Sequence, residues 1–363
     1  MSIILAVLLI LLICMMVVLI YRLGVFGKAI TGWKNDNIDS VRNVNSWLFP
    51  LFFVLGIGLL IYFYRTIKPD LIGEAVTEHG KWIDSSMSLS FNLILVIFFV
   101  AQAVLVLFVV VFQYNSKRKA SFYPINNRLE IVWTVIPLVV FLGLFVDGNY
   151  TWSKVMKKND EDLVVVEIIG MQFNWIARYP GVDNQLGDVN VKYIDGANTA
   201  GLNLTDPKGL DDFVSGEIHI PVNKNILFKI RSLDVIHSVF IPHFRLKMDA
   251  VPGMPTTFTF KPEKTTNEMK AETGNSWFNY SIYCAELCGR GHFAMKGDVV
   301  VDTEIEYEKW LKSQGSWLAR HKGYVKYVPD KYKDQAESII QHTPPETTAE
   351  DATFFYKDAN VKK

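Results

Sequence analysis

Cysteine is scarce in this sequence: among 363 residues there are only Cys14, Cys284 and Cys288. So few cysteines exclude a fold that is held together by a disulfide framework. No Cys-x-x-Cys-His run occurs, so covalent attachment of a c-type haem is excluded as well. Basic and acidic side chains are balanced at 37 each, and the net charge therefore gives no reason to expect a nucleic-acid partner.

Long apolar runs, by contrast, are abundant, and hydrophobic residues make up 50% of the chain. Four runs are each close to the length that spans a bilayer core as a helix: residues 3–20, 47–64, 91–112 and 131–146. A cleaved signal peptide is the alternative for the first run. No basic residue precedes that run and no small-residue cleavage site follows it, so we expect a retained helix.

The loops between these runs differ in charge. Two of them hold four basic residues each, namely Arg22, Lys28, Lys34 and Arg42, and then Lys117, Arg118, Lys119 and Arg128. Loops rich in lysine and arginine stay in the cytoplasm. We therefore expect a multi-pass membrane protein in which both chain ends, and everything after residue 147, lie outside.

After residue 162 the pattern changes to short β-rich runs separated by proline, glycine and asparagine. The clearest runs are residues 163–169, 226–230, 256–260 and 299–301. Such runs indicate an antiparallel β-sandwich or barrel rather than parallel α/β units. The predicted fold class is therefore all-β, anchored to a membrane by the preceding helices.

Three further segments interrupt or follow the β-rich part. Residues 182–217 are turn-rich and carry seven acidic and two basic side chains, a net charge of −5. We interpret them as a solvated insertion or as part of a docking surface for a basic partner. Residues 305–318 predict an amphipathic helix with Glu308 and Lys312 four residues apart. Pro344 and Pro345 predict a flexible end.

Four side chains that can bind metal share one short loop, namely Cys284, Cys288, His292 and Met295. This donor set favours copper, since sulfur holds Cu(I) and imidazole also suits Cu(II), whereas zinc sites use carboxylate rather than thioether. A single copper would take Cys288, His292, Met295 and one distant histidine. With Cys284 added, two copper ions would share both sulfurs. Each ion would be completed by one histidine and one weak donor, either Met295 or the backbone carbonyl of Glu286.

Two alternatives stay open on these residues alone. The two cysteines could form a small disulfide or remain inert thiols. The distant ligand could be His237, His243 or His219, because a single histidine in a strand is more often a structural residue than a ligand.

The run C-A-E-L-C-G-R-G-H-F-A-M at 284–295 resembles the binuclear copper (CuA) loop of subunit II of haem-copper cytochrome c oxidases, C-x-E-x-C-x-x-x-H-x-x-M. Three other stretches resemble the same family in the same order: residues 130–137 (E-x-x-W-T-x-x-P), 234–238 (D-V-x-H-S) and 247–253. The resemblance covers roughly residues 88–303.

The resemblance implies a cupredoxin-like Greek-key β-sandwich with a pair of copper ions. It implies that the ligands are His237, Cys284, Glu286 through its carbonyl, Cys288, His292 and Met295. In the family the carboxylate that matches Glu286 helps to bind Mg at the contact with subunit I.

The resemblance implies further roles and partners. Glu130 would lie at the entrance of a proton channel, and electrons would enter near Phe173 and Trp175. The partners would be subunit I, other oxidase subunits and a c-type cytochrome, in a bacterial inner (plasma) membrane. No haem is expected in this chain, since its seven histidines all lie outside the four apolar runs.

Three positions depart from the commoner family pattern. Phe173 stands where many members have a tryptophan, Leu233 replaces an acidic residue, and Met254 follows Pro-Gly where arginine is common. The identity of the donor and its docking mode therefore stay open. The sequence also does not indicate membership of a respiratory supercomplex. The two extra N-terminal runs suggest additional partner subunits.

The predicted organisation has five parts. These are two extra transmembrane helices (1–65), an external loop (66–90), a transmembrane helix hairpin (91–147), the external copper domain (148–303), and a C-terminal helix with a flexible tail (304–363). Two rival functions are a copper-free quinol oxidase subunit II and a membrane-tethered protein that stores copper, delivers it or braces an assembly. The quinol oxidase subunits lack the cysteine and histidine ligands, so the full set here argues against that rival.

Overall fold

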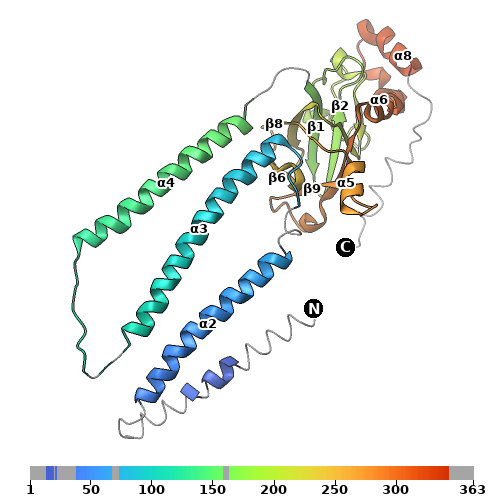
Figure 1. Ribbon diagram of the computed structural model, residues 1–363. Helices are drawn as coiled ribbons and strands as arrows, with labels where there is room; N and C mark the ends of the chain where they lie inside the picture. The colour runs from blue at the N-terminus through green and yellow to red at the C-terminus, as the bar shows by residue number, and fades with distance from the viewer. Residues whose placement is uncertain are drawn as a thin grey trace. The chain divides into compact units, whose positions relative to one another are not determined.

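The structure is a computed structural model that describes residues 14–19, 21–22, 38–67, 73–113, 115, 117–157 and 163–342. The chain divides into two compact units, drawn together in Figure 1. One unit comprises Met1–Lys68 and Ile94–Asn126, and the other comprises Pro69–Leu93 and Asn127–Lys363. Helix α3 (Glu78–Val111) contributes residues to both units.

Among the described residues, three helical segments are long and apolar enough to cross a membrane. They are Ser46–Thr66 within α2 (Ile38–Ile67), α3, and α4 (Asn127–Val155). Most of their large apolar side chains are exposed in the isolated chain, which suits contact with lipid or with other subunits. These helices contain the second, third and fourth predicted runs almost completely. Most of the first predicted run, residues 3–20, lies outside the described part of the chain.

The beginning of α3 differs from the prediction. The helix begins at Glu78, so residues 78–90 are helical where the sequence suggested a loop. This part lies against the β-domain: the Arg245 guanidinium donates to both carboxylate oxygens of Asp84, at 2.7 and 2.9 Å. The apolar pattern missed these turns because they are polar and draw their stability from tertiary contacts.

Ten strands form a sandwich of two five-stranded sheets (Figure 1). The first sheet has the order β3-β2-β1-β5-β8, with β1 Leu163–Met171, β2 Asn174–Tyr179, β3 Phe213–Ser215, β5 Asn225–Ser232 and β8 Thr256–Phe260. The second has the order β4-β10-β9-β6-β7, with β4 Ile218–Pro221, β6 His237–Ile241, β7 Leu246–Ala250, β9 Tyr280–Cys284 and β10 Lys296–Asp302. Inward side chains of both sheets, among them Phe228, Ile241 and Tyr280, form one core.

This architecture confirms the predicted membrane-anchored all-β class, and the four β-rich runs all fall in strands. The pairing is not purely antiparallel as predicted, because β1 runs parallel to β5 and β4 runs parallel to β10. Parallel neighbours need a long crossover instead of a hairpin. The segments between these strands supply that length, which local sequence patterns do not reveal.

A second, smaller core joins the acidic insertion to the C-terminal helices. The helices after the sandwich are α6 (Glu304–Ser313), α7 (Trp317–Arg320) and α8 (Lys333–His342), while α5 (Thr266–Thr273) lies within it. Leu202 and Leu210 of the insertion are buried with Trp317, Leu318 and Ala336. The insertion is therefore packed against the tail, and its interpretation as a merely solvated segment is wrong for these residues.

Several acidic side chains of the insertion are used within the fold. Asp195 accepts hydrogen bonds from two backbone N–H groups nearby, and Asp206 accepts one from the backbone of Asp188. Asp212 is fully buried and lies 2.8 Å from Arg178. The formal charge of −5 therefore overstates the field that this segment offers to a basic partner.

The predicted C-terminal helix is shorter than expected. Helix α6 ends at Ser313 because Gln314 adopts an extended conformation, with φ −82° and ψ 134°. The chain then turns so that Trp317 enters the second core. The expected pair of Glu308 and Lys312 is present at 3.6 Å. The prolines at 344 and 345 lie outside the described residues.

Candidate metal centre

Two neighbouring strands bring the distant histidine to the cysteine loop. His237 is the first residue of β6, and Cys284 is the last residue of β9. These strands pair antiparallel, with Val239 opposite Cys284. The loop after β9 then carries Cys288, and a short 3-10 helix, η6 (His292–Ala294), continues it. Residues far apart in sequence therefore meet at one end of the second sheet.

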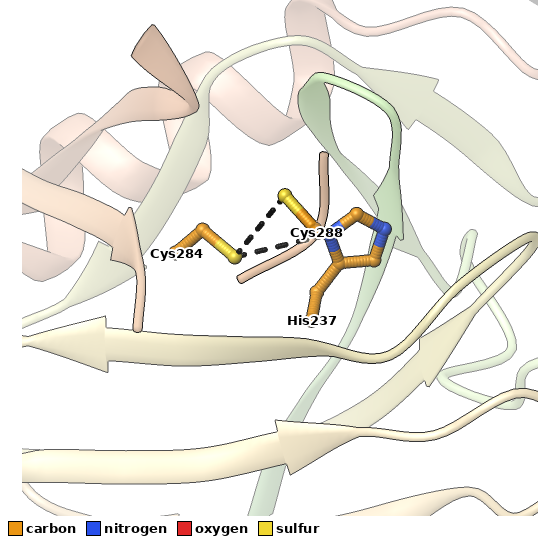
Figure 2. A group of neighbouring side chains, drawn as sticks. All are labelled: His237, Cys284 and Cys288. Atoms are coloured by element: carbon orange, nitrogen blue, oxygen red, sulfur yellow. Dashed lines mark hydrogen bonds between the residues drawn. The ribbon is translucent and has the colours of Figure 1, made fainter. Parts of the chain in front are cut away.

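The two sulfur atoms lie at the middle of the cluster, with Cys284 Sγ 3.7 Å from Cys288 Sγ (Figure 2). His237 Nδ1 lies 3.8 Å from Cys284 Sγ, and a dashed line in Figure 2 marks this contact. The remaining separations are 3.1 Å from Cys284 Sγ to Glu286 O, 3.7 Å from Cys288 Sγ to His292 Nδ1, and 3.7 Å from Cys288 Sγ to Met295 Sδ. Each sulfur therefore has one imidazole and one weaker donor beside it.

Most of these donors are buried. His237 is fully buried, and Cys284, Cys288 and Met295 are exposed by 9%, 4% and 1%. The candidate metal ligands His237, Cys284 and Cys288 have their donor atoms within 4.8 Å of one another. Glu286 differs, because its carbonyl faces Cys284 while the residue is exposed. A buried set of soft and imidazole donors fits copper.

The structure shows Cys284 and Cys288 as free thiols rather than as the disulfide considered above. Burial and the neighbouring Cys284 thiol raise the pKa of Cys288 to about 11. A metal ion would therefore have to displace the proton of Cys288 in order to bind its sulfur. The two sulfurs, 3.7 Å apart, are close enough for one metal ion to reach both at a metal–sulfur distance of about 2.3 Å, the length in zinc sites.

Asp234 sets the orientation of the His237 ring. Asp234 Oδ1 lies 2.8 Å from His237 Nε2 and accepts a hydrogen bond from the N–H group of that nitrogen. The lone pair of Nδ1 is then directed toward the sulfur atoms, as carboxylate partners do for histidine ligands at metal sites. Burial acts to raise the pKa of Asp234, yet hydrogen bonds from Gln172 and His237 hold that pKa below its usual value.

The two rival histidines lie elsewhere. His219 Nδ1 is 2.7 Å from Asp302 Oδ2, and its ring stacks on Trp310. His243 lies in a 3-10 turn after β6, η5 (Pro242–Phe244), and packs against the rings of Phe278 and Tyr280. Of the three candidates, the structure brings only His237 into the sulfur cluster.

The residues predicted to receive electrons flank the cluster. Trp175 is 1% exposed and its ring centroid lies 5.9 Å from that of His237. Phe173 lies in the turn between β1 and β2 and is 39% exposed. Glu130 lies in the first turn of α4, outside the group of candidate ligands.

Sequence reasoning missed the supporting residues. The sequence shows Asp234 only as part of a motif, although its position three residues before a candidate histidine ligand is a usable signal. Gln172 gave no local signal, because its partners Asp234 and Cys288 come from distant segments.

Comparison with known proteins gives two matching family models. Cytochrome C oxidase subunit II, periplasmic domain, matches residues 164–303, and cytochrome C oxidase subunit II, transmembrane domain, matches residues 74–146. The matched regions correspond to the sandwich with its cluster and to the span from the segment before α3 to within α4.

Two individual relatives agree with these family models. The chain is 34% identical over 243 residues to the alternative cytochrome c oxidase subunit 2 of Bradyrhizobium diazoefficiens, covering 66% of this chain and 82% of that one. It is 29% identical over 307 residues to cytochrome c oxidase subunit 2 of Thermostichus vulcanus, covering 70% and 81%. The crystal structure of the periplasmic domain of subunit II of cytochrome oxidase of Bradyrhizobium japonicum aligns with a TM-score of 0.29 at 24% identity, covering 43% and 94%. The chain belongs to the cytochrome c oxidase subunit II family.

Proposed function

We propose that this chain takes electrons from a c-type cytochrome at a binuclear copper centre outside the membrane. It passes them to haem in subunit I, where oxygen is reduced and protons are translocated. The observation that carries this proposal is the pair of sulfur atoms 3.7 Å apart, each with one imidazole and one weaker donor beside it. The oxygen chemistry belongs to the complex and not to this chain alone.

Six residues would hold the metal pair: His237, Cys284, Glu286 through its carbonyl, Cys288, His292 and Met295. A copper pair held by these residues would supply a reversible one-electron couple. The protein keeps the donors in place through the β6–β9 ladder and through burial, so that the geometry changes little with oxidation state.

Electrons would reach the centre from the side of Phe173. This ring is partly exposed and packs near Gly291, where a built Cβ would lie 2.5 Å from it. Trp175 is buried beside His237 and would act as part of the protein medium between donor and metal. Whether the oxidase joins a respiratory supercomplex would depend on which cytochrome is the electron donor.

Two acidic residues have roles that rest on the family. The Glu286 carboxylate is exposed, and it would bind Mg together with groups of subunit I. Glu130, in the first turn of α4, would lie at the entrance of a proton channel in that subunit. The Mg role uses Glu286, whose carbonyl is also a proposed copper ligand. The proton-channel role uses no residue of the metal cluster.

The chain would be a multi-pass protein of a bacterial plasma membrane. Its copper domain, 148–303, would lie outside, followed by a C-terminal helix and tail, 304–363. Two transmembrane helices would occupy residues 1–65, followed by an external segment at 66–90 and a helix hairpin at 91–147. The extra N-terminal helices would bind other oxidase subunits.

The test compares copper in the purified oxidase that contains this chain with copper in the same complex carrying Cys284→Ala and Cys288→Ala together. Haem content reports assembly. We expect the variant to lack two copper ions per complex and to lose the near-infrared band of a mixed-valence pair. A difference of one exchangeable ion would favour the copper-storage alternative. No difference, with no copper pair in the native complex, would favour the quinol oxidase alternative.

A further inference from the structure

The turn between β1 and β2 contacts both segments that carry the candidate ligands. The backbone N–H of Gln172 donates to Asp234 Oδ2 at 2.7 Å, and the other oxygen of Asp234 holds His237 at 2.8 Å. The side-chain Nε2 of Gln172 donates to the backbone carbonyl of Cys288 at 2.5 Å. One residue therefore joins the histidine segment to the cysteine loop.

The cysteine loop is shaped to receive this turn. A Cβ at Gly289 would lie 2.8 Å from Gln172 Nε2 and 3.0 Å from the ring of Phe173. A Cβ at Gly291 would lie 2.5 Å from that ring. Side chains at these two positions would push the turn away from the loop. The glycines therefore permit the close approach that the hydrogen bond from Gln172 requires.

We propose that Gln172 is a positioning residue that fixes the Cys288 loop relative to His237 and so tunes the metal centre. The proposal rests on the proposed function. The N–H group of the Gln172 amide places partial positive charge beside the Cys288 carbonyl oxygen. Electron density of this peptide is then drawn toward that oxygen and away from the Cys288 sulfur that would bind copper. A centre held in this way favours the reduced state more than one without the donor, so the amide raises the reduction potential.

The exposure of Gln172 separates this role from a structural one. Although its side chain bonds to the loop, the residue is exposed and lies outside the core. Surface substitutions of this kind change the stability of a fold little. Replacement of the side chain therefore removes one hydrogen bond to the loop without opening a cavity.

The test uses the assembled oxidase with Gln172→Met, which keeps a side chain of similar length but has no donor. Gln185→Met, at an exposed position of the same domain, is the matched control. Three readouts are measured: the copper hyperfine pattern in EPR, the midpoint potential of the centre, and the rate of copper loss to a chelator. Haem content confirms assembly.

For Gln172→Met we expect an altered hyperfine pattern, a lower midpoint potential, and copper loss that is about five- to tenfold faster, the factor that one ordinary hydrogen bond represents. Gln185→Met should match the native complex. If all three readouts are native in Gln172→Met, or if Gln185→Met changes them equally, the positioning role is wrong. Failure of the proposed function looks different, because the native complex would then show no copper pair at all.

Discussion

The imidazole of His219 on β4 stacks on the indole of Trp310 on α6, with ring centroids 4.3 Å apart and the planes 17° from parallel. Asp302 at the end of β10 lies 2.7 Å from the Nδ1 atom of the same histidine. Glu217 lies 3.5 Å from its Nε2 atom. These contacts hold helix α6 against the edge of the second sheet.

This arrangement predicts that the docking of α6 depends on pH. Burial acts to lower the pKa of His219, but hydrogen bonds to Asp302 and Glu217 raise it overall above its ordinary value of 6.5. A raised pKa in the folded state means that the stabilisation is complete below pH 6.5 and is lost as the pH rises through the folded value. Hydrogen exchange of the α6 amides, corrected for intrinsic rates, should therefore show less protection at pH 8.5 than at pH 6.

His219→Gln should abolish most of this pH dependence, since glutamine does not titrate. His342→Gln, at an exposed position on α8, is the matched control and should behave like the native chain. Protection of α6 that is constant with pH in the native chain would contradict the prediction.

Cys284→Ser should disrupt the proposed binuclear metal centre. Serine retains the shape of the side chain but removes the sulfur that lies 3.7 Å from Cys288, so one of the two proposed thiolate ligands is lost. We expect the near-infrared band of the metal pair to disappear and electron transfer from cytochrome c to fall to a small fraction. Optical and EPR spectra of the purified complex measure the first effect, and stopped-flow reduction measures the second. A native spectrum in this variant would mean that Cys284 is not a ligand.

The sequence alone places four candidate donors, Cys284, Cys288, His292 and Met295, in one contiguous stretch, and the structure brings these side chains together. The sequence could not rank His237 above His243 without the family resemblance. Nothing in the local sequence shows that β6 begins at His237 and ends before His243. The contact between Gln172 and Cys288 was also out of reach, because it depends on how the two sheets pack. Local patterns report periodicity and composition, whereas pairing between distant segments is decided by the whole fold.

The same limit explains the errors outside the metal centre. The turns that follow Glu78 are too polar to look like part of a membrane helix, yet Asp84 binds Arg245 of the β-domain. The composition of the insertion predicted a solvated segment. In the structure, Leu210 of the insertion and Trp317 of the C-terminal region are buried together in a second core. In both cases the segment is stabilised by tertiary contacts, which the local sequence does not reveal.

Asp234→Ala should weaken metal binding without removing a ligand. The substitution frees the His237 ring to turn and to change tautomer, because Asp234 Oδ1 no longer accepts a hydrogen bond from Nε2–H. Loss of such a partner costs about 10- to 100-fold in metal affinity. Copper retention against a competing chelator measures the effect. Asp298→Ala, at an exposed position on β10, is the control, and equal loss in both variants would contradict the assigned role.

Glu130→Gln tests the proposed proton-channel entrance. Because Glu130 lies in the first turn of α4 and outside the metal cluster, the copper spectrum should stay native. We expect slower steady-state oxygen consumption and slower proton uptake, since glutamine cannot carry a proton. Glu78→Gln makes the equivalent change in the first turn of α3 and should leave both rates unchanged. Native rates in Glu130→Gln would show that the carboxylate only stabilises the helix terminus.

Arg178→Met should destabilise the external domain, because this guanidinium is the partner of two buried carboxylates. Arg178 is 2% exposed and lies 2.7 Å from Glu167 and 2.8 Å from Asp212. Removing one member of a buried ion pair leaves an uncompensated charge and costs about 3–5 kcal/mol. The unfolding temperature of the external domain in the purified oxidase should fall by about 10 °C. Lys309→Met, which removes an exposed charge from α6, should shift it little.

The loss caused by Arg178→Met should also depend on pH. Burial raises the pKa of Asp212 to about 7 even with Arg178 present. Without the guanidinium that pKa rises further, so the stability associated with Asp212 is complete at low pH and is lost as the pH rises through the folded value. The variant should therefore lie closer to the native chain at pH 5, where Asp212 is protonated, than at pH 8. An equal deficit at both pH values would mean that the damage comes from lost packing around Arg178 and not from an unpaired buried carboxylate.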